Sequence, residues 1–334
     1  MLAGCGNSTP AGNGSTAGPT GAATAASLAA TGAGVSIPVQ TVAGPQDQPF
    51  LTTQISVGGG APATVWLDTG SSGLIMDPSA LGPDVTQGTQ TQTSEYESGN
   101  MVSAISTATV SLGGATTSSP ITIGVRDDSA STFQFPAGTV GIMGIATANA
   151  DSFSGQALFA PQLQLPAPLN AGSTLQAAPV GQTGTWTLGP VTPPSGATSV
   201  ALAALSGGST GAPAGYPALE RGVPLCWTVG STGPVCGPTD IDAGSPSAIL
   251  TGDQFAGLAG SGKLIGAGTA VTVGVQGGPT VWSFTSGSSY ADDTVGWVGT
   301  GLGANQFNTG LGFLIGRTVA WNYPAAQVWI GPQA

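Results

Sequence analysis

Acid–base chemistry in this chain falls to carboxylates. The 334 residues contain no histidine, which excludes Ser-His-Asp and Cys-His nucleophilic triads, histidine-ligated metals and histidine general bases. Two turns could each present a carboxylate instead. One runs from Asp68 to Ser71, directly after the apolar run Thr64–Leu67. The other runs from Asp242 to Ser245.

The first turn has the residues needed to hold its carboxylate. Gly70 permits a close approach of the backbone, and Ser71 can hydrogen-bond Asp68, three residues before it. Thr69 supplies a second hydroxyl. An Asx-turn at an ordinary hairpin would explain the Asp-x-Gly pattern alone, but not the apolar strand before it or the hydroxyls around it. We therefore expect Asp68 to be catalytic and its turn to support it.

The second turn repeats the first only in part. Asp242, Gly244 and Ser245 fit the pattern, whereas Ala243 takes the place of the hydroxyl residue. Asp240, two residues earlier, is a competing carboxylate, but it lacks the following glycine. We expect Asp242 to be the second catalytic residue, supported by Gly244 and Ser245.

The elements around these turns are predicted to be strands, because short apolar runs alternate with clusters of Gly, Pro, Ser and Thr. The 56 glycines and 26 prolines interrupt the chain too often for long helices, which predicts an all-β protein. The expected strands include Val35–Val39, Phe50–Val57, Thr64–Leu67, Ile105–Leu112 and Ile121–Val125. Short helices are expected near Ala157–Leu163 and Gly252–Ala259.

The chain is expected to form two β-rich lobes with one Asp turn in each, residues 35–195 and 196–334. The join is expected near Gly189–Gly211, and part of the segment Ser195–Ala214 could form a strand between the lobes. Residues 1–34 form a separate region. Its Gly/Ser/Thr/Ala-rich composition cannot bury a core and is typical of a flexible tether.

The first turn, with its continuation Ser72-Gly73-Leu74, resembles the first catalytic motif of pepsin-like aspartic proteases, and most closely the aspartic protease domains of bacterial PE-PGRS surface proteins. Further segments follow in the family's order, over roughly residues 46–332. Glu95–Met101 resembles the flap hairpin, and Gly141–Ala146 resembles the first apolar-apolar-Gly segment. Trp186–Gly189 resembles the strand ending the first lobe, and Phe313–Val319 resembles the second apolar-apolar-Gly segment.

The resemblance implies a bilobal double β-barrel with a central cleft and a few short helices. It implies an acid-acting endopeptidase in which Asp68 and Asp242 share one proton and activate a water that attacks a peptide bond. Tyr96 would be the flap tyrosine; an exposed tyrosine in a turn is the alternative. In the family a hydroxyl at the Ala243 position pairs with its mate, here Thr69, in a grip between the two catalytic turns. Its loss puts activity, rather than fold, in question.

Three alternatives remain open at this stage. An all-carboxylate metal site could also activate water, although the resemblance implies no metal and no cofactor. A catalytically silent protein of the same fold could bind a peptide, a protein or a glycan, which Ala243 favours. A plain β-rich adhesin would explain the composition, but not the order of the motifs.

Charge and cysteines limit partners and compartment. Four basic residues against fifteen acidic ones leave little to neutralise a phosphate backbone, so we expect no nucleic-acid partner. The resemblance implies a peptide or protein substrate. We also expect a monomer. Cys226 and Cys236 could form a disulfide in an oxidising compartment; two buried free thiols are the alternative.

The start of the chain carries a targeting motif. Leu2-Ala3-Gly4-Cys5 matches the lipobox of bacterial lipoproteins, in which the cysteine becomes lipidated. This predicts a protein on the cell envelope or extracellular face of a bacterium, in contact with the membrane only through a lipid on Cys5. The interpretation expects a signal sequence upstream.

Overall fold

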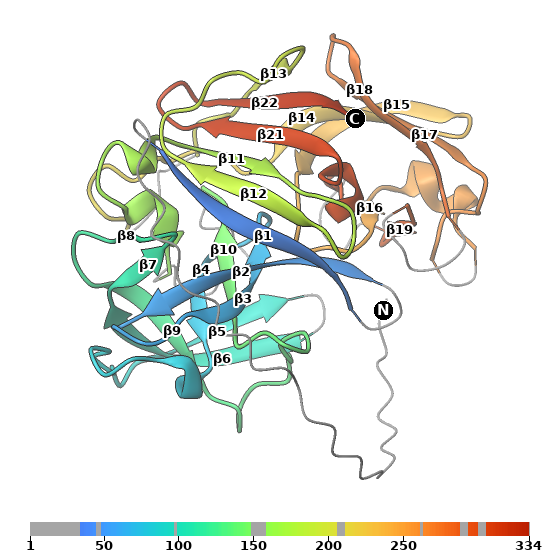
Figure 1. Cartoon of the computed structure of the whole chain (residues 1–334). Helices are drawn as coiled ribbons and strands as arrows, with labels where there is room; N and C mark the ends of the chain where they lie inside the picture. Colours follow the sequence, from blue (N-terminus) through green and yellow to red (C-terminus); the bar gives the residue numbers. More distant parts are fainter. Residues whose placement is uncertain are drawn as a thin grey trace.

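A computed structural model describes residues 34–44, 48–96, 99–147, 158–205, 211–260, 263–287, 293–299 and 305–333. Strands dominate, and they gather in two lobes (Figure 1). The predicted all-β, bilobal fold is confirmed. Four predicted features lie outside the described residues: the lipid attachment site at Cys5, the tether over residues 1–33, the flap tip at Glu97 and Ser98, and the helix start at Ala157.

The N-terminal lobe is built on one side of a 15-stranded sheet. Its strands are β2 (Pro49–Val57), β3 (Ala63–Asp68), β4 (Ser72–Met76), β5 (Thr91–Tyr96), β6 (Gly99–Ala108), β7 (Val110–Leu112), β8 (Ala115–Thr116), β9 (Ile121–Arg126) and β10 (Gly141–Ile145). Four of the five strands expected in the first 125 residues are present, because their apolar runs supply the buried face of this sheet. The fifth, Ile105–Leu112, is divided at Thr109 between the end of β6 and β7.

Six strands of the same sheet lie between the lobes, three from residues 35–195 and three from residues 196–334. They are β1 (Val35–Ala43), β11 (Gly172–Gln176), β12 (Thr183–Leu188), β13 (Thr198–Ala201), β21 (Arg317–Asn322) and β22 (Gln327–Gln333). The expected inter-lobe strand within Ser195–Ala214 is β13, which pairs with β22. The boundary at residue 195 stays a prediction.

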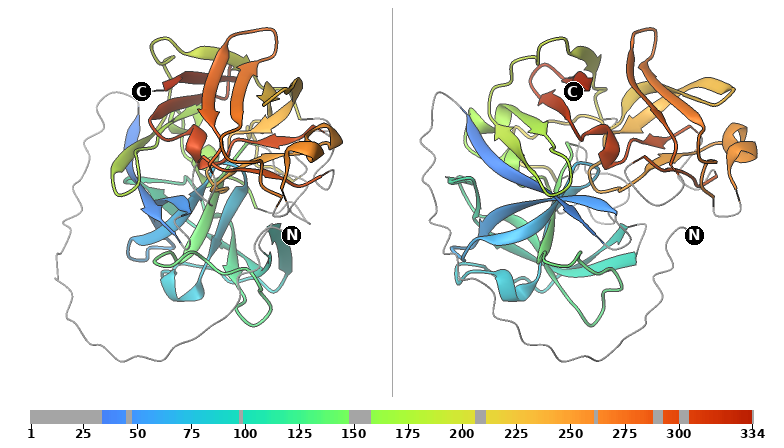
Figure 2. Two further views of the ribbon diagram at one scale, coloured as in Figure 1. Left: turned by 90° about the vertical axis from the view of Figure 1, so that its right-hand side faces the viewer. Right: turned by 45° about the vertical axis from the view of Figure 1, so that its right-hand side comes forward.

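The C-terminal lobe holds a separate seven-stranded sheet, in yellow to red-orange tones at the upper right of Figure 1 and again in the two views of Figure 2. The red strands β21 and β22 beside it belong to the 15-stranded sheet. Its strands are β14 (Val223–Val229), β15 (Thr232–Asp240), β16 (Ala248–Leu250), β17 (Ala270–Val275), β18 (Thr280–Thr285), β19 (Val295–Trp297) and β20 (Phe307–Asn308). Cys226 and Cys236 face each other across β14 and β15 and form a disulfide, as one of the two alternatives expected.

Within the described residues, the helices are short and of the 3₁₀ type. They are η2 (Pro78–Ala80), η3 (Pro161–Gln164), η4 (Leu169–Ala171), η5 (Asp253–Leu258) and η6 (Leu311–Phe313). The helix expected near Gly252–Ala259 is η5, and η3 overlaps the end of the other expected helix.

A continuous apolar core ties the two lobes together. Its buried members include residues of both sheets. Leu67 and Ile241, which directly precede Asp68 and Asp242, both belong to it. The core therefore anchors the backbone immediately before each carboxylate.

The second apolar-apolar-Gly segment was predicted at the wrong place. Phe313 ends η6, and Gly316 lies just before β21. The strand that runs parallel to β15 is β20, as β10 runs parallel to β3 in the first lobe. Because β20 and the residue after it carry Asn308 and Thr309 instead of two apolar residues, the apolar pattern did not identify this segment.

Candidate active site

The first turn holds Asp68 at the end of β3 through two donors. The backbone N–H of Gly70 donates to Oδ1 of Asp68 over 2.7 Å. The hydroxyl of Ser71 donates to Oδ2. β10 runs beside this turn, with Gly144 opposite Asp68, and a side chain at Gly144 would overlap the backbone of Ser71. The predicted supporting residues of the first turn are therefore in contact with its carboxylate or next to it.

The second turn holds Asp242 two residues after β15, and it differs in one donor. The N–H of Gly244 donates to Oδ1 of Asp242 over 2.7 Å, as in the first turn. The hydroxyl of Ser245, however, donates to the backbone oxygen of Ser247. The donor to Oδ2 is the side-chain amide of Asn308 on β20. Sequence reasoning missed Asn308, because no local motif links it to the turn.

The two turns face each other with approximate two-fold symmetry. A side chain at Gly70 would overlap the carboxylate of Asp242, and a side chain at Gly244 would overlap the carboxylate of Asp68. Both residues are buried: the exposed fraction is 5% for Asp68 and 9% for Asp242. Each glycine is thus required by the close approach of the opposite carboxylate.

The electrostatics of the pair favour retention of one proton. Burial, followed by the negative charge of Asp242, raises the pKa of Asp68 from 3.8 to about 8. The hydrogen bonds from Ser71 and Gly70 act in the opposite direction but do not outweigh burial. Since two adjacent carboxylates cannot both ionise cheaply, one of them retains a proton well above its ordinary pKa.

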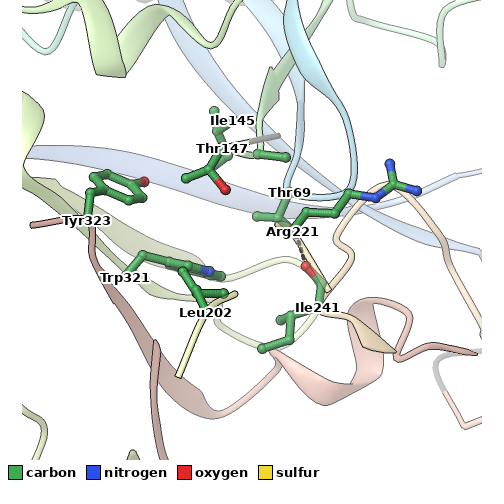
Figure 3. A pocket seen from close by; sticks show the side chains of 9 residues that line it. Thr69, Ile145, Thr147, Leu202, Arg221, Ile241, Trp321 and Tyr323 are labelled. Atoms are coloured by element: carbon green, nitrogen blue, oxygen red, sulfur yellow. Dashed lines mark hydrogen bonds between the residues drawn. The ribbon is translucent and has the colours of Figure 1, made fainter. Parts of the chain in front are cut away.

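Thr69 links the two turns across the lobes (Figure 3). Its hydroxyl donates to the backbone oxygen of Ile241 over 2.6 Å and accepts from the N–H of Ala243 over 2.7 Å. One half of the expected grip is therefore present. Ala243 has no hydroxyl to make the reciprocal half. Ala243 therefore removes one half of the hydrogen bonds of the grip, not all of them.

Arg221, which the sequence did not single out, provides a second link. Its Nη1 donates to the backbone oxygen of Gly70 over 2.6 Å. Its Nε lies 3.0 Å from Oδ2 of Asp240. One guanidinium thus connects the first catalytic turn with the strand that leads to Asp242. Asp240, the competing candidate, is engaged in this ion pair, and burial raises its pKa to about 6 against the effect of Arg221.

A small cavity lies beside this link, between the lobes (Figure 3). Its volume is about 20 Å³. Residues of both lobes line it, among them Thr69, Thr147, Ile241 and Tyr323. A space of this size holds about one water molecule, so it cannot be a peptide-binding site.

Tyr96 lies at the end of β5, where the hairpin with β6 turns back. Its ring packs on Phe133 with 4.7 Å between the ring centroids. Burial, and then the charge of Asp68, raise the pKa of Tyr96. The tyrosine therefore stands on a hairpin near the first carboxylate, the place that the flap prediction requires; its role as a flap stays a prediction.

A sequence model of the PE-PGRS C-terminal aspartyl peptidase-like domain matches residues 35–316. The chain belongs to this family. The aspartyl peptidase-like domain also has the fold of the aspartic proteinase from Irpex lacteus: the TM-score is 0.64 at 18% identity, over 90% of this chain and 98% of that one. Among curated protein sequences, none matches this aspartyl peptidase-like chain.

Two further observations concern the described part of this aspartyl peptidase-like domain only. Within those residues, no three side chains of His, Cys, Asp or Glu are grouped so that they could hold a metal ion. No helix among them is both long and apolar enough to cross a membrane.

Thr69→Val is expected to destabilise the aspartyl peptidase-like domain by about 2 kcal/mol or more, because it leaves the buried oxygen of Ile241 and N–H of Ala243 without a partner at nearly constant volume. Urea denaturation measures this. Thr41→Val is the matched control: Thr41 is buried and gives up one hydrogen bond, to Ala178, far from the turns. Equal losses in both variants would contradict a special role for Thr69.

Proposed function

We propose that this protein is an aspartic endopeptidase that hydrolyses peptide bonds with a water molecule activated by Asp68 and Asp242. The observation that carries the proposal is the two-fold arrangement of the turns, in which Gly70 and Gly244 each lie against the opposite carboxylate. Such an arrangement brings two carboxyl groups to one substrate bond, where one can act as base and the other as acid.

The proposed mechanism gives the two carboxyl groups different tasks. Ionised Asp242 takes a proton from the attacking water, and protonated Asp68 donates a hydrogen bond to the scissile carbonyl oxygen. The proton then passes to the leaving amine through the same pair, so no covalent intermediate forms. The raised pKa of Asp68 supports its role as the protonated member.

The pKa of Asp68 sets the alkaline limit of this mechanism. Because that pKa is raised to about 8, the singly protonated pair persists from acidic pH to about that value. Activity is therefore expected at acidic pH, to extend toward neutral pH, and to fall as Asp68 ionises. The acidic limit is reached when the pair takes up its second proton.

Digestion of a mixed peptide pool tests the proposal. The protein is incubated with the pool at several pH values from acidic to neutral, with and without pepstatin, and cleavage is read by mass spectrometry. The Asp68→Asn variant, purified in parallel, is the blank for contaminating proteases. Cleavage that pepstatin and Asp68→Asn both suppress supports the proposal.

The second candidate is a catalytically silent binding protein of the same fold, and Ala243 is the observation that favours it. Without a hydroxyl at this position, the grip between the turns keeps the half made by Thr69 and lacks the reciprocal half. No cleavage at any pH, in a protein that is shown to be folded and does not bind pepstatin, would favour this candidate over the peptidase.

We further propose that the protein acts at the bacterial cell envelope, anchored through Cys5. The supporting observation is the lipobox followed by the tether-like residues 6–34. Expression behind a bacterial signal sequence is expected to yield an acylated protein in the membrane fraction, detected by mass spectrometry of the N-terminal peptide. Cys5→Ser should be released or unprocessed. Acyl-free wild-type protein in the soluble fraction would contradict the anchor.

A further inference from the structure

The outer oxygens of the two carboxylates are bound by different chemical groups. Oδ2 of Asp68 accepts from the hydroxyl of Ser71. Oδ2 of Asp242 accepts from the side-chain amide of Asn308. The inner oxygens, by contrast, are treated alike, since each accepts from the glycine N–H of its own turn. The asymmetry of the site therefore lies at Asn308.

The orientation of the Asn308 amide is fixed by its other end. Oδ1 of Asn308 accepts from the backbone N–H of Gly310 over 2.7 Å. A backbone N–H can only donate, so the amide oxygen must face Gly310 and Nδ2 must face Asp242. A flipped amide would place two donors against each other at Gly310 and two acceptors against each other at Asp242.

The backbone around Asn308 is held on both sides. β20 pairs parallel with β15, Asn308 opposite Asp240, and antiparallel with β16, Asn308 opposite Ile249. The next residue, Thr309, donates its N–H to the oxygen of Asp240 over 2.9 Å. Its hydroxyl accepts from the N–H of Asp242 over 3.2 Å. β20 thus fixes both the backbone and the carboxylate of Asp242.

The two donors differ in the protonation states of the carboxyl oxygen that they can bind. The hydroxyl of Ser71 can either donate or accept, so it suits Asp68 with or without its proton. Nδ2 of Asn308 can only donate, so it suits an ionised oxygen and would oppose an O–H at the same position. Among the described residues, Asp68 across the turns and Asp240 on β15 also place their charges beside Asp242, and Asp240 is paired with Arg221.

We propose that Asn308 is a positioning residue that keeps Asp242 as the ionised member of the pair, the base toward water, and leaves the shared proton on Asp68. This inference rests on the proposed function for its catalytic meaning. The contact itself, between Nδ2 of Asn308, which can only donate, and Oδ2 of Asp242, does not depend on turnover.

The kinetic test compares Asn308→Leu with Asn322→Leu. Leu keeps the branched side-chain skeleton of Asn but is larger and has no donor, so turnover is expected to fall by about a hundredfold with little change in KM. Without the donor, the pair takes up its second proton more easily, so the acidic limb of the kcat/KM profile should move to higher pH by about one unit. Asn322→Leu makes the same change at an asparagine of β21 outside the two turns, whose side-chain oxygen accepts from the N–H of Ala325 over 3.2 Å, and neither quantity should change.

A spectroscopic test needs no turnover. In a nitrogen–proton correlation spectrum, the Asn308 side-chain amide is assigned by its absence from Asn308→Leu. Its signals should shift as the pair takes up its second proton, and this shift should disappear in Asp242→Asn.

Two results would overturn the proposal. One is a loss of turnover in Asn308→Leu without movement of the acidic limb, which is the result of a merely structural role. The other is an Asn308 amide signal that does not respond to protonation of the pair. If wild-type protein cleaves nothing while the amide signal still titrates, the proposed function fails and the assignment of Asn308 stands.

Discussion

Asp68→Asn and Asp242→Asn are each expected to lower peptide hydrolysis by about a thousandfold or more in a protein that stays folded. Each variant removes the acid or base partner of a shared-proton pair while the volume of the side chain hardly changes. The measurement is the rate of cleavage of one peptide from the digested pool, with circular dichroism to confirm folding.

Asp240→Asn is the control for these two variants. It lies two residues from Asp242 and is engaged by Arg221, and an amide oxygen can still accept from the guanidinium. We expect only a mild loss of activity. A harmless Asp242→Asn together with an inactive Asp240→Asn would show that the second catalytic residue is Asp240.

The same variants report on the shared proton without any substrate. In the unfolded chain Asp68 ionises near its ordinary pKa of 3.8, whereas in the folded protein its pKa is raised to about 8. A group with a raised pKa contributes stability that is complete below 3.8 and is lost as the pH rises through about 8. Asn cannot ionise, so the free energy of unfolding of Asp68→Asn, relative to wild type, should increase across this window.

The pH range of that gain distinguishes the carboxylates. Asp240 has its pKa raised only to about 6, so Asp240→Asn should gain stability relative to wild type over a narrower window that ends near that pH. Urea denaturation at a series of pH values measures both curves. A flat difference for Asp68→Asn would mean that Asp68 does not retain its proton in the folded protein.

The first catalytic turn could be predicted from sequence because both hydrogen-bond donors of its own turn to the carboxylate are local. Gly70 and Ser71 lie two and three residues from Asp68 and both donate to it. The strand before the turn is an unbroken apolar run, so the element that positions the carboxylate was also evident. The all-β, two-lobed architecture followed for the same reason, since its signals are short-range patterns.

The second turn could be predicted only in part, because its support comes from distant residues. The local pattern suggested Ser245, but the hydroxyl of that residue satisfies the oxygen of Ser247 instead. The group that reaches the carboxylate is Asn308, 66 residues further along the chain. Pairing of β20 with β15 brings it there, and no periodicity in a single sequence encodes which strands pair in parallel.

Arg221 is hidden from sequence reasoning in the same way. It acts across a separation of 151 residues, on the backbone oxygen of Gly70, and a backbone atom leaves no trace in residue type. This link explains how the two turns can stay aligned although Ala243 supplies no hydroxyl. Where Thr69 supplies half of a grip, Arg221 adds another bond from the second lobe to the first turn.

Arg221→Met is expected to lower turnover by about tenfold to a hundredfold, because the first turn loses a charge-assisted bond and the alignment of the two carboxylates loosens. Arg221→Lys should behave almost as badly, since one ammonium group cannot bridge Gly70 and Asp240 as the guanidinium does. Peptide cleavage under single-turnover conditions measures both. Wild-type rates in Arg221→Met would show that the link is dispensable.

If Arg221 compensates for the missing hydroxyl at Ala243, substitutions at the two positions should be coupled in a double-mutant cycle. By the approximate two-fold symmetry of the turns, Ala243→Ser would add a hydroxyl facing the backbone beside Asp68, the reciprocal of the bonds made by Thr69. Alone it should raise turnover by only about a few-fold, because Arg221 already holds the turn. Combined with Arg221→Met it should restore much of the lost rate, which corresponds to a coupling of about 1 kcal/mol between the sites. Strictly additive effects would mean that the guanidinium and the missing hydroxyl do not serve the same alignment.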